Sequence, residues 1–220
     1  IYSTYLGGSN SSEFPHSLIA DPDDNLVMFG TTGSSNYPTT VGCYDASFNG
    51  GTDTNIDGYI NLNSGSDIVI TKFNATGTTL LGSTYYGGNK NDGLNQSDLK
   101  YNYADDARGE VFLDDSNNIY IASCTRSGNL PTTSGSFQPN IGGKEDACIA
   151  RFNSNLSALT AATFLGGSED DAAYSVKIDA AGIVYVCGGT RSTNLPITAG
   201  SYKTTYSGGN ADGFIAKLNA

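Results

Sequence analysis

An internal repeat constrains the fold of this chain more than any other feature: four short motifs recur three times, in the same order. The first, the aromatic Gly-Gly motif, reads YSTYLGG, GSTYYGG and AATFLGG and ends at Gly8, Gly88 and Gly167. The second copy ends 80 residues after the first, and the third ends 79 residues after the second. Self-similarity at this spacing indicates a repeat architecture, in which each unit buries its apolar surface against its neighbours.

Three further motifs follow the aromatic Gly-Gly motif in each repeat and align residue for residue. The hairpin motif, two apolar runs around an Asp, begins at Ser17, Glu110 and Ser175 (SLIADPDDNLVMFGTT, EVFLDDSNNIYIASCT and SVKIDAAGIVYVCGGT). The proline motif begins at Ser34, Ser127 and Ser192 (SSNYPTT, SGNLPTT and STNLPIT). The Asp-strand motif begins at Asp67, Asp146 and Asp212 (DIVITKFN, DACIARFN and DGFIAKLN).

The motifs have the pattern of β-strands, because short runs of β-branched and aromatic residues alternate with turn residues. In the turn of the hairpin motif we expect Asp21, Asp114 and Asp179 to accept backbone N–H bonds. A second hairpin is expected around Asn74–Gly77, between the Asp-strand motif and the next aromatic motif. Four antiparallel strands per repeat, connected as a meander, are typical of a propeller blade.

The sequence therefore predicts an all-β fold, a β-propeller built of four-stranded antiparallel blades. The chain holds three blades in a single domain, residues 1–220, with repeats at about 1–80, 81–158 and 159–220. Propeller rings have about four to eight blades, so the chain is either part of a larger ring or joins a second chain to make one. We expect Ile1–Gly8 to pair with the last strand, Phe214–Asn219, as a latch within one chain or between two.

Two insertions distinguish the repeats, at about Thr52–Ser66 in the first and about Asn89–Ala107 in the second. We expect both to form loops that carry any partner specificity, because repeats supply a scaffold and loops supply recognition. The first insertion contains a near-copy of the Asp-strand motif at Asp57. We prefer Asp67 as the start of that strand, since ITKFN leads directly into the next hairpin.

The charge of the chain excludes some partners. Its 22 acidic and 11 basic residues give a net charge of −11, which repels phosphate backbones and anionic lipid, so nucleic-acid binding is not expected. No run of 18 apolar residues occurs, so direct membrane insertion is not expected either. Low lysine content and acidity favour secretion. The chain begins at Ile1 without a signal peptide, and we expect a mature or excised piece of a longer precursor.

Calcium is the one cofactor that the sequence suggests. Oxygen-donor side chains follow the Gly-Gly pairs and gather in the first insertion, and Ca²⁺ prefers such ligands. No strict DxDxDG loop is present, so the alternative is that these acids are solvated turn residues. The candidate ligands are Asp53, Asp57, Asp92, Glu169, Asp170 and Asp171.

No catalytic constellation is apparent, and the chain is expected not to be an enzyme. The single histidine, His16, would have to serve any Ser-His-Asp triad, and we interpret it as an exposed turn residue. Neither GxSxG nor HExxH occurs. Acidic neighbours such as Asp105 and Asp106, or Glu169–Asp171, have the chemistry of glycoside cleavage, but acids in such loops also serve turns.

The four cysteines form no CxxC pair, so a structural zinc site is not expected. Cys124 and Cys148 belong to the second and third strands of the second repeat, where they could lie opposite each other and form a disulfide. Cys187 is expected to be a small buried apolar residue, and Cys43 a free loop residue.

Tyrosines near the proline motifs bear on sugar binding, because aromatic rings stack on sugars. The alternative is that these side chains pack their loops onto their own blades. The four tyrosines concerned are Tyr37, Tyr44, Tyr202 and Tyr206.

Together the motifs resemble the bacterial seven-bladed β-propeller repeat, the SBBP repeat family. The family pattern runs from Tyr-Leu-Gly-Gly through an Asp-turn hairpin, Gly-x-Thr-x-Ser and Pro-Thr-Thr to Asp-(Ala/Gly)-Phe-(Val/Ile)-Ala-Lys-Leu. The third repeat matches nearly throughout, in YSVKIDAAGIVYVCGGTRSTNLPITAGSY and ADGFIAKLN. The resemblance covers almost the whole chain, and the first repeat departs from it at Gly33, where the others have Arg126 and Arg191.

The resemblance implies a secreted or cell-surface bacterial protein, since such repeats accompany adhesion modules and sorting domains, and it supplies no catalytic residues. The expected function is a non-catalytic structural or binding module in adhesion or extracellular assembly. Its expected partners are other blades or protein chains, including a second copy of itself. Two alternatives stay open: a lectin-like propeller that binds cell-surface glycan, and a secreted hydrolase that uses loop carboxylates.

Overall fold

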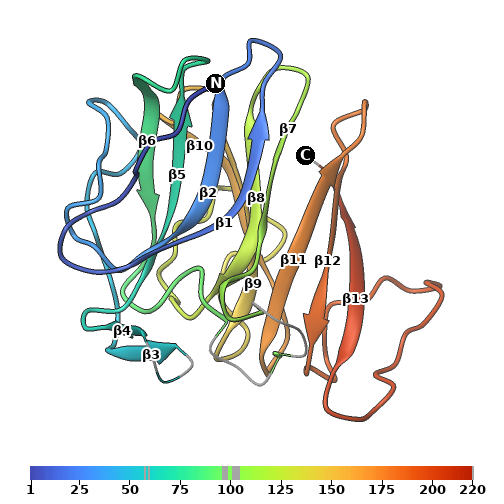
Figure 1. Cartoon of the computed structure of the whole chain (residues 1–220). Helices are drawn as coiled ribbons and strands as arrows, with labels where there is room; N and C mark the ends of the chain where they lie inside the picture. Colours follow the sequence, from blue (N-terminus) through green and yellow to red (C-terminus); the bar gives the residue numbers. More distant parts are fainter. Residues whose placement is uncertain (57, 59, 96–98, 101–104, 220) are drawn as a thin grey trace.

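The computed structural model describes residues 1–220 except 57, 59, 96–98, 101–104 and 220. Within the described residues the fold is all-β, with 13 strands in four antiparallel sheets and one short 3-10 helix. Three of the sheets stand side by side in a row, and the fourth is a small hairpin at one end of the first sheet (Figure 1).

The sheets follow the order of the repeats. The first sheet, ordered β1-β2-β5-β6, contains β1 (Glu13–Ala20), β2 (Leu26–Thr32), β5 (Asp67–Phe73) and β6 (Leu80–Tyr86). The second, ordered β10-β9-β8-β7, contains β7 (Glu110–Leu113), β8 (Ile119–Thr125), β9 (Asp146–Phe152) and β10 (Leu159–Leu165). The third, ordered β11-β12-β13, contains β11 (Asp171–Ile178), β12 (Val184–Thr190) and β13 (Asp212–Leu218).

The predicted turns of the hairpin motif are confirmed. Asp21 Oδ1 accepts the backbone N–H of Asp23 at 3.0 Å and that of Asn25 at 2.9 Å, which closes the turn between β1 and β2. The same bonds recur in the other repeats, where Asp114 accepts from Ser116 and Asn118 and Asp179 accepts from Ala181 and Ile183.

The second predicted hairpin is also confirmed, and it links neighbouring repeats. The N–H of Gly77 donates to the carbonyl of Asn74 at 2.9 Å, and β6 then pairs with β5. Since β6 carries the aromatic motif of the second repeat and β10 that of the third, a complete sheet holds three strands of one repeat and one strand of the next. The preferred start of the third strand is confirmed, because β5 begins at Asp67, opposite Thr32.

The prediction of four antiparallel strands in each sheet is confirmed for the first two sheets and is wrong for the third, which has three strands. The expected latch is absent within the chain, because Ile1–Gly8 forms no strand and does not pair with β13. This segment lies along the first sheet instead, where Leu6 packs on Tyr37, Val69 and Tyr85. The described sheets therefore form an open row, with the first and third sheets at its ends (Figure 1).

The core lies between the sheets. Side chains such as Phe29, Tyr86 and Phe152 fill the space between the first and second sheets, and a second cluster around Val176 and Val186 fills the space between the second and third. The central strand β8 is buried at every position because a sheet covers each of its faces. Burial of this kind, at about 25 cal/mol per Å² of apolar surface, is the main driving force that holds the row together.

We predicted that both insertions form loops, and this prediction is only partly right. The first contains the small hairpin of β3 (Thr54–Ile56) and β4 (Ile60–Leu62), and the second contains the 3-10 helix η1 (Asp105–Ala107). None of the described residues lies in a helix long and apolar enough to span a membrane.

Candidate functional site

A buried carboxylate holds the chain where it passes from the first sheet to the second. Asp92 Oδ2 accepts the backbone N–H of Gly88 at 2.7 Å and the hydroxyl of Ser127 at 2.9 Å, and Oδ1 accepts the hydroxyl of Thr125. Gly88 follows β6 of the first sheet, whereas Thr125 and Ser127 lie at the end of β8 of the second. We call this arrangement the inter-sheet cluster, because it fastens two sheets to each other.

The same pattern of hydrogen bonds occurs in all three repeats, although in the first repeat it joins only parts of the first sheet and the segment before it. In each, an acidic side chain accepts the N–H of the second glycine of the Gly-Gly pair and a hydroxyl at the end of the hairpin motif or in the proline motif. The other two members are Asp171, with Gly167 at 2.7 Å and Ser192 at 2.8 Å, and Glu13, with Gly8 at 3.0 Å and Thr32 at 3.1 Å.

Close approach of the backbone explains why the second residue of each pair is glycine. A Cβ atom on Gly88 would lie 2.4 Å from the Cβ of Ser127, and one on Gly167 would lie 2.5 Å from the Cβ of Ser192. The aromatic Gly-Gly motif and the proline motif therefore recur together because they are two sides of one contact.

A second row of carboxylates begins the third strand of each repeat. Asp67 accepts the backbone N–H of Asn49 at 2.6 Å and that of Gly50 at 2.9 Å, so it closes the loop that precedes β5. Asp146 has the same place before β9, with the N–H groups of Gly142 and Gly143 at 2.8 and 3.0 Å.

Burial shifts the titration of these acids. It raises the pKa of Asp67 to about 8, to which the nearby charge of Asp92 adds, and it raises the pKa of Asp92 to about 7. Burial likewise raises the pKa of Asp146 to about 6 and moves that of Asp171 upward. The hydrogen bonds from backbone and hydroxyl groups act in the opposite direction but do not cancel the cost of burying a charge.

Raised carboxyl pKa values also suit general acid catalysis, so access to a substrate decides between the two roles. The cavity of about 310 Å³ beside Tyr120 and Leu218 is not lined by the buried acids of the inter-sheet clusters. Neither is the cavity of about 110 Å³ beside Asn95 and Asp106. Each acid is bonded to groups of its own chain, so the arrangement holds loops and sheets in place.

The candidate calcium ligands do not come together. Asp92 and Asp171 are buried in separate inter-sheet clusters, and the carboxylate of Asp170 lies 3.7 Å from the guanidinium of Arg191. Among the described residues, no three His, Cys, Asp or Glu side chains are grouped closely enough to hold a metal ion. The other candidates are the exposed Asp53 and Glu169, and Asp57, which lies outside the described residues.

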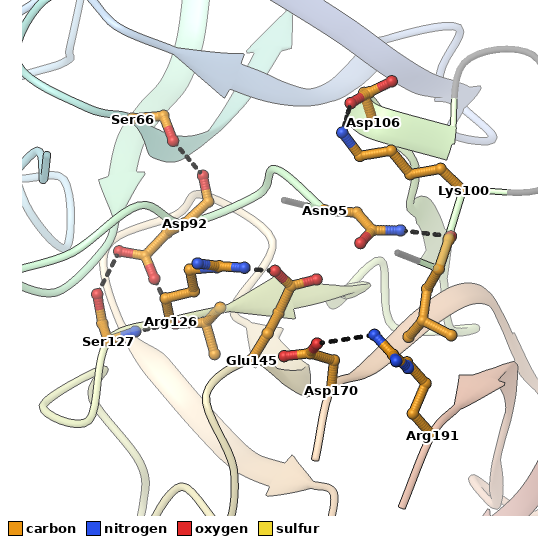
Figure 2. A network of polar contacts seen from close by, with 12 residues as sticks. Ser66, Asp92, Asn95, Lys100, Asp106, Arg126, Ser127, Glu145, Asp170 and Arg191 are labelled. Atoms are coloured by element: carbon orange, nitrogen blue, oxygen red, sulfur yellow. Dashed lines mark hydrogen bonds and ion pairs between the residues drawn. The ribbon is translucent and has the colours of Figure 1, made fainter. Parts of the chain in front are cut away.

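Figure 2 shows ion pairs beside the Asp92 cluster that the motifs did not predict. Arg126 Nε donates to Glu145 Oε2 at 2.9 Å, and the Glu145 side chain is fully buried. Arg191 has the place of Arg126 in the third repeat and pairs there with Asp170. The sequence did contain a signal for these ion pairs. An arginine directly precedes the proline motif in the second and third repeats, whereas Gly33 has this place in the first.

The predicted Cys124–Cys148 disulfide is wrong, since both thiols are free and buried. The register of β8 and β9 places Cys124 opposite Ala147 and Cys148 opposite Ser123. Because successive side chains of a strand point to opposite faces, this offset of one residue sends the two sulfurs to opposite sides of the sheet. Cys187 is exposed, contrary to the prediction.

His16 is not the exposed turn residue that we predicted. It lies in β1, at a bulge where the register shifts between Pro15 and Ser17, and its ring packs edge-on against Phe29 with centroids 5.0 Å apart. Both ring nitrogens are buried and have no hydrogen-bond partner among the described residues. Burial lowers the pKa of His16 to about 3, so the neutral ring serves as a core aromatic.

Two of the four candidate sugar-stacking tyrosines have structural roles. Tyr37 is buried with its hydroxyl 2.8 Å from that of Thr71, and the ring of Tyr44 packs on Phe152 with centroids 5.6 Å apart. Tyr202 is fully exposed and Tyr206 is half-buried, both in the loop before β13.

The turn aspartates differ in burial, which allows a matched test. Replacing Asp21 by Ala is expected to lower the free energy of unfolding by about 2–4 kcal/mol, because Lys72, 2.8 Å away and buried, would become an uncompensated charge. The control is Asp179→Ala, at the same position of the third repeat but exposed, where a smaller loss is expected. Urea unfolding followed by circular dichroism measures both, and equal losses would contradict the role assigned to Lys72.

No model of a known protein family matches the chain, and a search of curated proteins finds none that is similar enough to count as a relative.

Proposed function

We propose that this chain is a non-catalytic scaffold of β-propeller type, belonging to the SBBP repeats, in a secreted or cell-surface bacterial protein that acts in adhesion or extracellular assembly. The observation that carries the proposal is the inter-sheet cluster, in which the buried acids Asp92 and Asp171 fasten the first sheet to the second and the second to the third. Acids committed in this way are structural groups, and the loops between them remain available for recognition.

The arrangement of the sheets supports the propeller assignment. Two four-stranded antiparallel sheets and a three-stranded one stand in a row, each with a meander order, and apolar clusters fill both spaces between them. This is how blades pack in a propeller. The acidic composition and the motif resemblance support secretion.

The hydrolase alternative finds less support, because most of the acids that it would use are already paired. Asp105 lies 2.8 Å from the guanidinium of Arg108, and Asp106 pairs with Lys100. Ion-paired acids of this kind hold the second insertion around η1, and among the described residues no carboxylate other than that of Asp106 lines the cavity of about 110 Å³ beside it.

The test combines a binding measurement with an activity measurement on the purified chain. We expect saturable binding to immobilised bacterial envelope material and no release of reducing sugar from bacterial polysaccharides. A variant in which residues 53–61 are replaced by a short Gly-Ser turn keeps the buried Leu62 and should bind more weakly while its circular dichroism is unchanged, because the β3–β4 hairpin belongs to an insertion and not to the repeat. Sugar release that is lost in Asp105→Ala or Asp106→Ala would overturn the proposal.

A further inference from the structure

The two insertions belong to different repeats, but they line one cavity together. The first contributes Thr54–Ile56 from the β3–β4 hairpin, and the second contributes Leu94, Asn95, Lys100 and Asp106. We call this space, of about 110 Å³, the insertion cavity. None of the described residues that line it belongs to a motif that the three repeats share. The insertion cavity is therefore a part of the fold that the repeats do not dictate, which is where recognition is expected.

The second insertion is anchored in the core, so its side of the cavity is fixed. Leu99 is fully buried and packs on residues of β8 and β11. The hydroxyl of Tyr174 and the side-chain amide of Asn95 both donate to the carbonyl of Leu99, at 3.0 and 2.7 Å. The backbone N–H of Asn95 donates to the carbonyl of Asp106 at 2.9 Å. Lys100 directly follows this anchor in the chain.

A pair of opposite charges lies on the anchored side of the cavity. The ammonium of Lys100 contacts one carboxylate oxygen of Asp106 (Figure 2). The Lys100 side chain is 37 % exposed and that of Asp106 is 17 % exposed, so both are within reach of a ligand. An ammonium has three N–H donors and a carboxylate has two acceptor oxygens. The pair can therefore donate to a ligand and accept from it while it stays paired.

The hairpin side of the cavity supplies an acceptor and an apolar surface. The side-chain N–H of Asn55 donates to the side-chain oxygen of Asn61 at 2.6 Å, across the two strands of the hairpin. The amide nitrogen is thus committed within the hairpin, and the group that Asn55 offers to the cavity is its carbonyl oxygen. Ile56 and Leu94 add carbon surface to the lining.

The charges and the size of the cavity restrict the chemistry of its ligand. Asp106 and the net charge of −11 disfavour an anion, and the ammonium of Lys100 disfavours a cation. A wholly apolar group would cover the polar groups of the lining without bonding them. A hydroxyl suits the cavity, because it accepts from an ammonium and donates to a carboxylate or amide oxygen.

The volume indicates how much of a ligand can enter. A cavity of about 150 Å³ holds the six carbon atoms of benzene, so one of about 110 Å³ holds roughly four heavy atoms. Two neighbouring carbon atoms with a hydroxyl on each have this size, and a sugar ring presents such an edge.

We propose that the insertion cavity binds the edge of a neutral sugar through two adjacent hydroxyls, with Lys100 as donor and Asp106 and Asn55 as acceptors. The inference rests on the proposed function and deepens it by naming the class of ligand that the scaffold recognises. Among the described residues Asp106 is the only carboxylate that lines the cavity. Cleavage of a glycosidic bond by the usual mechanism needs two, so we expect the sugar to be bound and not hydrolysed.

The experiment is a titration of the purified 220-residue chain with the methyl α-glycosides of glucose, mannose and galactose, followed by NMR. We expect a Kd on the order of 1 mM for at least one of them, because few ligand atoms are enclosed. Lys100→Met should weaken this binding about tenfold through the loss of a bond from a charged donor, and Asn55→Ala about threefold through the loss of a neutral acceptor.

The matched control is Asn61→Ala. It breaks the same hydrogen bond of the hairpin as Asn55→Ala does, but it removes no group that lines the cavity. Its Kd should stay within about twofold of the wild-type value. Asn55, Asn61 and Lys100 are exposed, so all three variants should keep the circular dichroism of the wild type.

Three outcomes would overturn the inference. The wild-type chain could bind none of the three glycosides at about twenty times the expected Kd, or it could bind them as well after both Lys100→Met and Asn55→Ala. Glucuronate could also bind more tightly than the neutral glycosides, which would assign the cavity to anions. If the chain still bound envelope material without releasing sugar in any of these cases, the proposed scaffold function would stand without this ligand. Sugar binding without envelope binding would instead support the inference and contradict the proposed function.

Discussion

Replacing Asp92 by Ala is expected to lower the free energy of unfolding by about 3–5 kcal/mol, which is a large fraction of the stability of a typical domain. The carboxylate is fully buried and accepts bonds from Gly88, Thr125 and Ser127. Its removal leaves three donors without an acceptor in a place that water does not reach, at about 1–3 kcal/mol each before the structure relaxes. Because those donors belong to two sheets, the loss falls on the contact between the sheets.

Two variants keep this prediction testable if the alanine variant fails to fold. Asp92→Asn retains the shape and one acceptor, and its neutral amide resembles the protonated acid that a pKa of about 7 allows, so a loss of about 1–2 kcal/mol is expected. Glu169→Ala, at an exposed acid in the third repeat, should stay within about 0.5 kcal/mol of the wild type. The measurement is urea unfolding followed by circular dichroism. A loss below about 1 kcal/mol for Asp92→Ala would show that the cluster does not fasten the sheets.

The strand order was predictable because local signals determine it. The Asp turns, the hairpin around Gly77 and the start of β5 at Asp67 depend on residues that are close in the sequence. The repeat itself added the information that the same hairpins recur. The first two sheets therefore appear as the sequence predicts, with the aromatic motif as their fourth strand.

The roles of the acids were not predictable in the same way, because they depend on contacts between distant residues. Asp92 accepts a hydrogen bond from Ser127, which is 35 positions away in the sequence. From the sequence alone, an aspartate at this place cannot be distinguished from a turn residue or a calcium ligand. The disulfide prediction failed because β8 and β9 pair with Cys124 and Cys148 one residue out of register. The number of residues between the two cysteines does not reveal this register. The prediction that His16 lies in a turn was wrong because β1 continues through the segment around Pro15 and His16 by means of a bulge, which the sequence does not indicate.

Stability is expected to fall by about 2–4 kcal/mol as the pH rises from about 5 to about 8. Burial raises the pKa of Asp67 to about 8, that of Asp92 to about 7 and that of Asp146 to about 6. The folded state therefore binds more protons than the unfolded state in this range. Stability from these groups is fully present below the pKa of an unfolded Asp, near 4, and is lost as the pH passes through the folded values.

A second, acidic limb should run in the opposite direction. Burial by itself would raise the pKa of Asp21, but the hydrogen bonds from Lys72 and Asn25 outweigh burial and lower this pKa to about 2. The stability that this group contributes is present above about pH 4 and is lost as the pH falls toward 2, so the maximum is expected near pH 4. Urea unfolding across this pH range gives the whole curve. Asp67→Asn removes the group with the highest of these carboxyl pKa values and should flatten the limb above pH 6 while leaving the acidic limb unchanged. Stability that instead stays level between pH 5 and 8 would mean that the buried acids are charged in the folded chain, held so by their N–H and hydroxyl donors.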